Sequence, residues 1–350
     1  MKKYIINDLD DNTMNGGRKA RNDVFHFAKE AGFEEVVLPF IIHPQDRSLK
    51  AKLKKLKYSK ITIPHLIKNI SDADVIVFQY PMYSTYLMNH LIADLKKYTR
   101  AKLIYVIHDI EGIRMFNDSQ DYSNNEMNIL KQADGIIAHN QAMQDWLKKH
   151  GITAQMTHLG IFDYLNPQPL NTNENYDKSV VFAGSLEKST FLKKLNPTHP
   201  FILYGPHPTT NYGYNIEYKG KLSPEELPKN LTQSFGLVWD GDEIQSCAGP
   251  YGYYLKYNDP HKVSLYLSSG IPVIVWNQAA LAQFITANKI GVTINDLKDL
   301  DSLLDSISPT EYHEIKENTL KIATKLRSGF YIKNALKKIV KQVMVDDDFY

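Results

Sequence analysis

The chain has 350 residues, of which 43% are hydrophobic and 23% are charged, and its formal net charge is +2. This length exceeds one typical core and predicts two domains of ordinary size. The near balance of Lys and Arg with Asp and Glu argues against a nucleic-acid-binding protein. Because Cys247 is the only cysteine, no intrachain disulfide can form, and we expect a cytoplasmic protein.

The amino terminus carries two lysines followed by a short apolar run, so we expect no signal peptide. No stretch approaches the eighteen or so apolar residues that a membrane span requires.

The first half alternates short Val- and Ile-rich segments with helical ones, which is typical of a parallel sheet covered by helices. We predict strands at residues 3–7, 35–40, 74–79, 102–108 and 135–139, and helices at 18–31, 84–98, 124–132 and 141–150. Residues 1–162 then form the first domain.

Two local lysine runs stand out from the balanced composition. One spans residues 50–60, and the other lies in the C-terminal helical segment at Lys333, Lys337, Lys338 and Lys341. We interpret both as solvated helix faces, with a membrane-surface or partner-binding patch as the alternative.

Residues 163–178 are polar and rich in Asn and Pro, which predicts a linker. Strands are predicted again at 179–183, 201–204, 215–218, 236–239 and 271–275. A capping box at residues 223–226, with Pro224 at the first helical position, predicts a helix start. A second domain therefore spans 179–330. A C-terminal helix and tail at 331–350 can pack back on the first domain. The pattern is that of an α/β protein with two Rossmann-like, doubly wound domains facing a central cleft, where ligands bind.

A helix preceded by Asp259 and Pro260 is a candidate anion site. Asp259 suits the N-cap position and Pro260 the first helical position, which places His261 and Lys262 in the first turn. Asn258 is an alternative cap, and Gly270 ends the helix. Free N–H groups and a lysine would attract an anion. The equally weighted alternative is a structural helix with a solvated lysine.

Three turns after predicted strands of the second domain could hold a nucleotide. They contain Gly184, Ser185 and Lys188, then Tyr204 and Gly205, then Gly220, Leu222 and Ser223. Glycine permits close approach of a ligand to the backbone, and Ser or Lys can donate to phosphate. Each turn alone can also be a simple chain reversal. Together with Lys262 they favour a nucleotide diphosphate.

In the first domain, polar residues follow predicted strands at the same edge. His108 and Asp109 could take a proton from a sugar hydroxyl, or they could form a structural hydrogen-bonded pair. Gly16 and Gly17, which precede a helix, allow close approach of a ligand to the backbone, and the Tyr80 ring could stack on an acceptor sugar or simply pack.

Other catalytic classes have little support in the sequence. The twelve histidines are scattered, with no HExxH or CxxC motif, so no metal site is predicted. No GxSxG follows a strand, which argues against a serine hydrolase.

Residues 235–240, 257–262 and 268–275 resemble the carboxyl half of bacterial GT-B glycosyltransferases. The nearest likeness is to the glucosyltransferase 3 family, which extends the sugar on serine-rich repeat adhesins. Residues 78–81, 107–109 and 182–184 extend the likeness to most of the chain. Proteins labelled galactofuranosyltransferases share these motifs.

The resemblance implies a GT-B fold and transfer of a hexose, glucose or GlcNAc, from a UDP-sugar to a GlcNAc-bearing glycoprotein. It implies inversion at the anomeric carbon without a metal or another cofactor. It also implies a homo-oligomer, a tetramer. For the location we expect the cytoplasm, with peripheral attachment to the inner membrane face as an option. No nucleic acid and no membrane span are expected.

Carried onto this chain, the resemblance has Lys188 and Lys262 contact the diphosphate, Leu222 flank uracil, and Gly16 with Gly17 border the acceptor. The full acceptor set is Asn15, Gly16, Gly17, Tyr80 and Arg114. The full donor set is Gly184, Ser185, Lys188, Tyr204, Gly205, Gly220, Leu222, Ser223, Asn258, His261, Lys262 and Ser264. Lys188 stands where an arginine is expected, and Leu222 where a tyrosine is expected.

Asp109 is the candidate base and His108 the second choice, since a single displacement needs one base on the acceptor side. The alternatives are a UDP-galactofuranose or other UDP-hexose transferase of cell-surface polysaccharide synthesis, a UDP-sugar epimerase, and a non-catalytic GT-B partner of another transferase.

Overall fold

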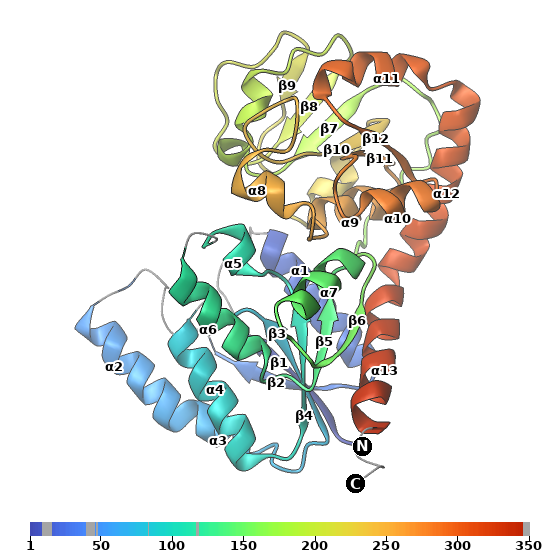
Figure 1. The fold of residues 1–350 in the computed structure, drawn as a ribbon. Coiled ribbons are helices and arrows are strands. Elements are labelled where there is room, and N and C mark those ends of the chain that lie inside the picture. The colour runs from blue at the N-terminus through green and yellow to red at the C-terminus, as the bar shows by residue number, and fades with distance from the viewer. Residues whose placement is uncertain (9–15, 40–45, 47, 83, 117–118, 346–350) are drawn as a thin grey trace.

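The computed structural model describes residues 1–8, 16–39, 46, 48–82, 84–116 and 119–345. Its strands form two six-stranded sheets, with the orders β2-β1-β3-β4-β5-β6 and β12-β11-β10-β7-β8-β9. All pairings within both sheets are parallel. Figure 1 shows the two α/β domains one above the other. The prediction of two doubly wound domains is confirmed.

The first domain contains all five predicted strands and one more. Its strands are β1 (Lys3–Asp8), β2 (Glu34–Leu38), β3 (Val75–Tyr80), β4 (Lys102–Ile107), β5 (Gly135–Ala138) and β6 (Gln155–His158). Its helices are α1 (Gly16–Glu30), α2 (Leu49–Lys57), α3 (Ile63–Lys68), α4 (Thr85–Tyr98), α5 (Glu111–Arg114), α6 (Gln120–Leu130) and α7 (Gln141–Lys149), and a π-helical turn at Tyr58–Thr62 joins α2 to α3. Strand β6 was missed because it lies at the sheet edge and both its terminal residues are exposed and polar.

The second domain follows the Rossmann strand order. Its strands are β7 (Val180–Ala183), β8 (Phe201–Tyr204), β9 (Ile216–Tyr218), β10 (Phe235–Val238), β11 (Val273–Trp276) and β12 (Gly291–Ile294). Its helices are α8 (Gly249–Tyr254), α9 (His261–Ser268), α10 (Ala282–Ala287), α11 (Leu300–Ser306) and α12 (Pro309–Arg327). Since β7 pairs with both β8 and β10, the direction of strand addition reverses between β7 and β10. Ligands of such sheets bind at this switch point.

The predicted helix at Ser223 is wrong. The Ser223 hydroxyl accepts a hydrogen bond from the Glu226 backbone N–H (3.2 Å), as a cap would, but only a turn and a 3-10 helix (Leu227–Asn230) follow. Pro228 has no N–H to donate to the Pro224 carbonyl. The Tyr164 hydroxyl donates to that carbonyl instead (3.1 Å).

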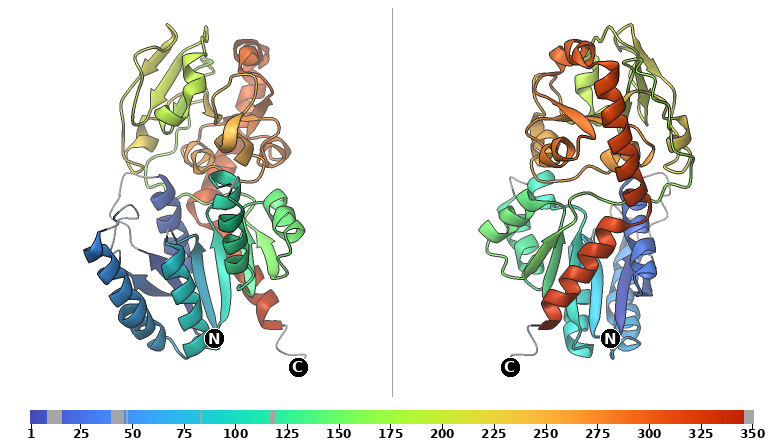
Figure 2. Two further views of the ribbon diagram at one scale, coloured as in Figure 1. Left: turned by 60° about the vertical axis from the view of Figure 1, so that its left-hand side comes forward. Right: turned by 90° about the vertical axis from the view of Figure 1, so that its right-hand side faces the viewer.

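The C-terminal helices connect the two domains. Helix α12 packs against α9, and α13 (Phe330–Val345) packs on β5, β6 and α1 of the first domain. Figure 2 shows this crossing from one domain to the other. At Gly135 of β5, a Cβ atom would lie 2.9 Å from side-chain atoms of Ile339 and Val343. Glycine at this position therefore lets α13 approach the sheet closely.

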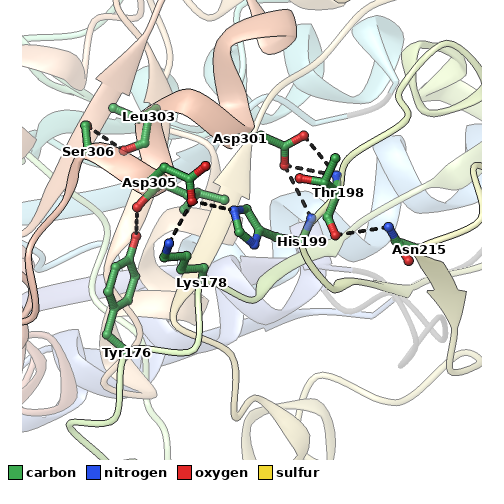
Figure 3. Close-up of polar contacts among 10 residues, drawn as sticks. Tyr176, Lys178, Thr198, His199, Asn215, Asp301, Leu303, Asp305 and Ser306 are labelled. Atoms are coloured by element: carbon green, nitrogen blue, oxygen red, sulfur yellow. Dashed lines mark hydrogen bonds and ion pairs between the residues drawn. The ribbon is translucent and has the colours of Figure 1, made fainter.

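The start of the second domain is fastened to α11, as Figure 3 shows. The Tyr176 hydroxyl donates to the Leu304 carbonyl (2.6 Å), while Lys178 and His199 both contact the Asp305 carboxylate (2.7 and 2.9 Å). These contacts lie next to the amino ends of β7 and β8, opposite the carboxyl ends where ligands bind.

Candidate functional site at the interdomain boundary

The switch point of the second domain holds a lysine between two strand ends. The Lys262 ammonium lies 2.9 Å from Asp240 Oδ1 and 3.3 Å from the Trp239 carbonyl, just after β10. It is also 3.8 Å from the position that a Cβ on Gly184, just after β7, would occupy. The structure thus brings together Gly184 and Lys262, both predicted for the donor site.

The three predicted glycine turns lie on adjacent strand ends. Gly205 donates its backbone N–H to the Gly220 carbonyl (3.0 Å). Gly205 has φ +149°, and a Cβ there would lie 1.8 Å from the Gly184 carbonyl oxygen. A side chain cannot fit at this contact, so the requirement for glycine at residue 205 is steric as well as conformational.

Four further predicted donor residues lie beside these turns. Ser185 follows Gly184 and precedes a 3-10 helix (Leu186–Lys188). The Lys188 ammonium lies 4.8 Å from the centre of the Tyr251 ring. Leu222 and Ser223 follow Gly220, and both side chains are partly exposed. Their contacts with a nucleotide remain predictions.

Two predicted donor residues point elsewhere. The Tyr204 side chain is 8% exposed within the second-domain core, and its hydroxyl donates to the Asn230 carbonyl (3.4 Å). Ser264 is 1% exposed and donates to the Phe162 carbonyl (2.6 Å). Both side chains are thus buried against protein, and their place in the donor site remains a prediction.

The start of α9 also differs from the prediction. Pro260, rather than Asp259 or Asn258, occupies the N-cap position. The Asp259 carboxylate accepts from the Asn140 amide (2.6 Å), and the Asp259 N–H donates to His139 Nδ1 (2.9 Å). Asp259 therefore joins the two domains and does not cap the helix.

The side chain of His261 is packed against the start of the linker. Its ring stacks on that of Tyr164, with centroids 4.9 Å apart. Burial lowers the pKa of His261 to about 3, so the ring is neutral. Both His261 Nε2 and Asn258 Oδ1 are buried without a hydrogen-bond partner among the described residues. Their place in the donor site remains a prediction.

The carboxyl end of β4 presents the two candidate bases. His108 Nε2 lies 2.8 Å from Gln79 Oε1, and burial holds the pKa of His108 well below its ordinary value. Burial raises the pKa of Asp109 to about 6, although the guanidinium of Arg114, 3.3 Å away, opposes this shift. A carboxylate with a pKa near 6 is ionised at neutral pH and is the better-matched base.

The start of helix α5, which follows Asp109, is held in place by a residue distant in the sequence. Glu126 of α6 accepts hydrogen bonds from the backbone N–H groups of Glu111 (3.0 Å) and Gly112 (2.7 Å). It also accepts from the Tyr80 hydroxyl (3.0 Å). Tyr80 is 3% exposed and its hydroxyl is satisfied within the core, and its contact with an acceptor remains a prediction.

The remaining acceptor candidates lie at the expected edge. Gly16 and Gly17 open α1, and Asn15 lies outside the described residues. Arg114 pairs with Glu111 as well as with Asp109, so its guanidinium orients carboxylates. A role of Arg114 and the two glycines in acceptor binding remains a prediction.

Residues of α8 attach the second domain to the first. Tyr254 is 2% exposed and belongs to the hydrophobic core of the first domain. Its hydroxyl accepts a hydrogen bond from the Ile110 N–H (2.8 Å), next to Asp109. Burial is the largest influence on the pKa of Asp109 and raises it, whereas the positive charges of Arg114, Arg21 and Lys188 lower it, in that order of size. The charge of Lys188, in the second domain, thus acts on the candidate base in the first domain.

Comparison with known proteins agrees with this arrangement. The family model described as "Glucosyltransferase 3-like, N-terminal domain" matches residues 2–161, and its C-terminal counterpart matches residues 180–339. The chain belongs to the glucosyltransferase 3-like family. It is 31% identical to the β-1,6-galactofuranosyltransferase WbbI of Escherichia coli (strain K12), covering 96% of this chain and 98% of that one. It is 27% identical to Glucosyltransferase 3 of Streptococcus gordonii, covering 93% and 94%.

Solved structures show the same GT-B fold at low sequence identity. A sucrose-phosphate synthase from Thermosynechococcus elongatus aligns with a TM-score of 0.61 and 12% identity, covering 99% of this chain and 100% of that one. A trehalose-6-phosphate protein from E. coli, bound with UDP-2-fluoro glucose, aligns with a TM-score of 0.63 and 10% identity, covering 97% and 99%. The resemblance recognised in the sequence is confirmed, and this family member is a glycosyltransferase.

Sequence analysis of this glucosyltransferase 3-like chain missed several residues that shape the site. Asp240, Glu126 and Tyr254 were not among the predicted site residues, yet they contact Lys262, the start of α5 and the Ile110 N–H. Arg21 of α1 donates to the carbonyls of Gln79 (2.7 Å) and Pro81 (2.5 Å). Each of these side chains acts on a partner more than ten residues away, and only the fold reveals such partners.

Proposed function

We propose that the protein transfers a hexosyl group from a UDP-sugar to a sugar-bearing acceptor, with inversion and without a metal. The position of the Lys262 ammonium between the ends of β7 and β10 carries this proposal. In a Rossmann-type domain the switch point is the expected place for a nucleotide. A lysine and backbone N–H groups can stabilise the negative charge of the leaving UDP.

The donor contacts follow from the strand ends. Lys262 and Lys188 would neutralise the diphosphate, beside the backbone of Gly184 and Ser185. Leu222 would lie against the uracil ring. These groups are on one domain, so the sugar would extend from the diphosphate toward Asp109 on the other.

The chemical step is a single displacement. The acceptor hydroxyl gives its proton to the Asp109 carboxylate while its oxygen attacks the anomeric carbon. The bond from that carbon to the β-phosphate oxygen breaks, and UDP leaves with the electron pair. The pKa of Asp109, about 6, suits this role. His108 is less suited because burial lowers its pKa well below the ordinary value, which makes it a weak base.

For the acceptor, we propose a GlcNAc-bearing serine-rich repeat glycoprotein, contacted by residues near Gly16, Gly17 and Arg114. We further propose a cytoplasmic homotetramer. Family membership and the names of the streptococcal relatives support the choice of a glucose donor.

Transfer of galactofuranose in polysaccharide synthesis is a second candidate. It is favoured by the 31% identity to a galactofuranosyltransferase, which exceeds the 27% and 24% identities to the two streptococcal proteins. Both candidates use the same diphosphate contacts and differ in the sugar.

A donor panel tests the proposal. Purified protein is incubated with UDP-glucose, UDP-GlcNAc, UDP-galactose or UDP-galactofuranose and a GlcNAc acceptor, and both the melting temperature and the product are measured. We expect one donor to raise the melting temperature and to yield a disaccharide. If no donor does either, the proposed activity is wrong.

Lys262→Ala tests the placement of the diphosphate. Removing a charged hydrogen-bond donor should weaken UDP-sugar binding by about tenfold or more. Lys256→Ala, which removes a lysine packed on the Trp276 ring, is the matched control and should bind normally. Equal affinities of the Lys262 and Lys256 variants would remove Lys262 from the donor site.

A further inference from the structure

Helix α2 presents leucines to solvent, which the sequence pattern alone did not show. Leu49, Leu53 and Leu56 are 74%, 59% and 49% exposed. At 3.6 residues per turn these three side chains fall within an arc of about 60°. Ala51, the buried residue of this helix, points in nearly the opposite direction. The apolar stripe therefore faces directly away from the domain.

The segment after α2 extends and anchors this stripe. Ile61 in the π-helical turn is 60% exposed. A π-helix turns by a smaller angle per residue than an α-helix, and this smaller rotation keeps Ile61 near the leucine stripe. Tyr58 and Ser59 are buried, and the Ser59 hydroxyl lies 3.0 Å from the Tyr86 hydroxyl. The C-terminal end of α2 is thus attached to the domain. Figure 1 shows α2 on the outer flank of the first domain.

Positive charge flanks the stripe on both sides. Residues 48–71 contain seven lysines and no acidic residue. On the helix, Lys52 lies on one side of the leucines, and Lys50 and Lys57 lie on the other. A stripe of apolar side chains between lysines is the arrangement of a helix that lies in the interface of an anionic bilayer.

We propose that α2 docks this protein on an anionic lipid surface, with the leucine stripe in the headgroup region and the flanking lysines on lipid phosphates. The positive charge around the stripe favours a bilayer over a second copy of the chain as the binding partner. In a symmetric dimer the same patch would meet itself, which would bring two sets of lysines together. An anionic bilayer complements both the apolar and the basic parts. This inference does not depend on which sugar the protein transfers.

Vesicle sedimentation tests the proposal with the full chain. We expect binding to vesicles of equal parts phosphatidylglycerol and phosphatidylcholine, weak binding to pure phosphatidylcholine, and weakening in about 0.5 M NaCl. The double variant Leu53→Gln/Leu56→Gln should lower the partition coefficient at least about tenfold. Lys52→Gln/Lys57→Gln should lower it by a similar factor, because each lysine contributes to attraction by the surface.

Matched controls lie on the second domain. Tyr214→Gln changes an aromatic side chain that is 97% exposed, and Lys321→Gln/Lys325→Gln removes two exposed lysines of α12. Both should bind vesicles like the wild type. Because all variants change exposed residues, we expect their melting temperatures to equal that of the wild type. This measurement checks that each variant folds.

Three results would overturn the proposal. One is the absence of binding to anionic vesicles, as expected if an acidic protein were the partner of α2. Another is a dimer that dissociates in the leucine variant while vesicles do not bind. The third is loss of binding in Lys337→Gln/Lys341→Gln but not in the α2 variants, which would favour the 520 Å³ groove that α13 forms with the amino terminus.

Discussion

Asp109, the proposed catalytic base, lies at the boundary between the domains, and its pKa depends on its surroundings there. Burial raises the pKa of its carboxyl, and the nearby Arg114 charge limits that rise, leaving a pKa of about 6. At this pKa the group is ionised at neutral pH but still accepts a proton readily. The carboxylate remains 20% exposed, so a substrate can reach it.

This balance predicts a shift in the pH profile. We expect kcat/KM of the wild type to fall below about pH 6, where Asp109 is protonated. In Arg114→Leu the fall should begin at a higher pH, because the charge that lowers the pKa of Asp109 is gone. Asp109→Asn should lower kcat by about 10²-fold or more at every pH. An Arg114 variant whose acidic limb stays in place or moves to lower pH would contradict this assignment.

Gly205 provides a second test at the residue scale. Gly205→Ala should destabilise the protein by at least about 1–3 kcal/mol and weaken donor binding, because the new Cβ would overlap the Gly184 carbonyl. Gly220→Ala is the control, since Gly220 also has positive φ (+101°) but nothing lies within 4 Å of its Cβ position. Urea unfolding and donor titration measure both effects. Equal losses in the two variants would show that backbone strain alone matters.

At the scale of elements, contacts over long sequence distances decide what the short helices do. Helix α5 has only four residues and is capped by Glu126 of α6. Helix α8 has six residues and places Tyr254 in the core of the other domain. Helices this short are not stable on their own. Their positions, and with them that of Asp109, depend on tertiary packing.

Tyr254 should therefore contribute to stability across the boundary. Tyr254→Phe keeps the ring but leaves the Ile110 N–H without its partner, which should cost about 1–3 kcal/mol. Tyr254→Ala should cost about 3–5 kcal/mol, as expected for a buried aromatic residue. Chemical denaturation measures both variants. If Tyr254→Ala costs no more than Tyr214→Ala, a change at an exposed tyrosine, the boundary contact is unimportant.

At the scale of the whole molecule, the boundary between the two domains contains the buried carboxyl group of Asp259. Burial raises the pKa of Asp259 to about 8, and the hydrogen bond from Asn140 only partly opposes this. The raised pKa means that the folded protein favours the protonated carboxyl. The contribution to stability is fully present below the unfolded pKa of about 3.9 and is lost as pH rises through about 8.

Asp259→Asn should remove this contribution. Between pH 5 and 8 the wild type should lose unfolding free energy with a slope of at most about 1.4 kcal/mol per pH unit, and the variant should have a flatter profile. Asparagine keeps an oxygen for the Asn140 amide and carries no charge. Denaturation at several pH values provides the measurement. Parallel profiles for the two proteins would show that Asp259 does not titrate in this range.

The sequence by itself determined the two parallel sheets and the glycine turns at their strand ends. Buried strands are continuous apolar runs, and glycine turns after them are local signals, so the regions of Gly184, Gly205 and Gly220 were found. Only the tertiary structure decided which side chains are available. It buried Tyr204 and Ser264, whose partners lie far away along the chain.

Contacts with residues far away along the chain also explain the outcome at Ser223 and at α2. The turn at Ser223 had the sequence of a helix start, but Pro228 and Tyr164 together prevented the helix. The lysines of α2 were visible in the sequence, yet the orientation of its leucines toward solvent was not. Local patterns predict which elements form, whereas burial and pairing depend on residues that only the fold brings together.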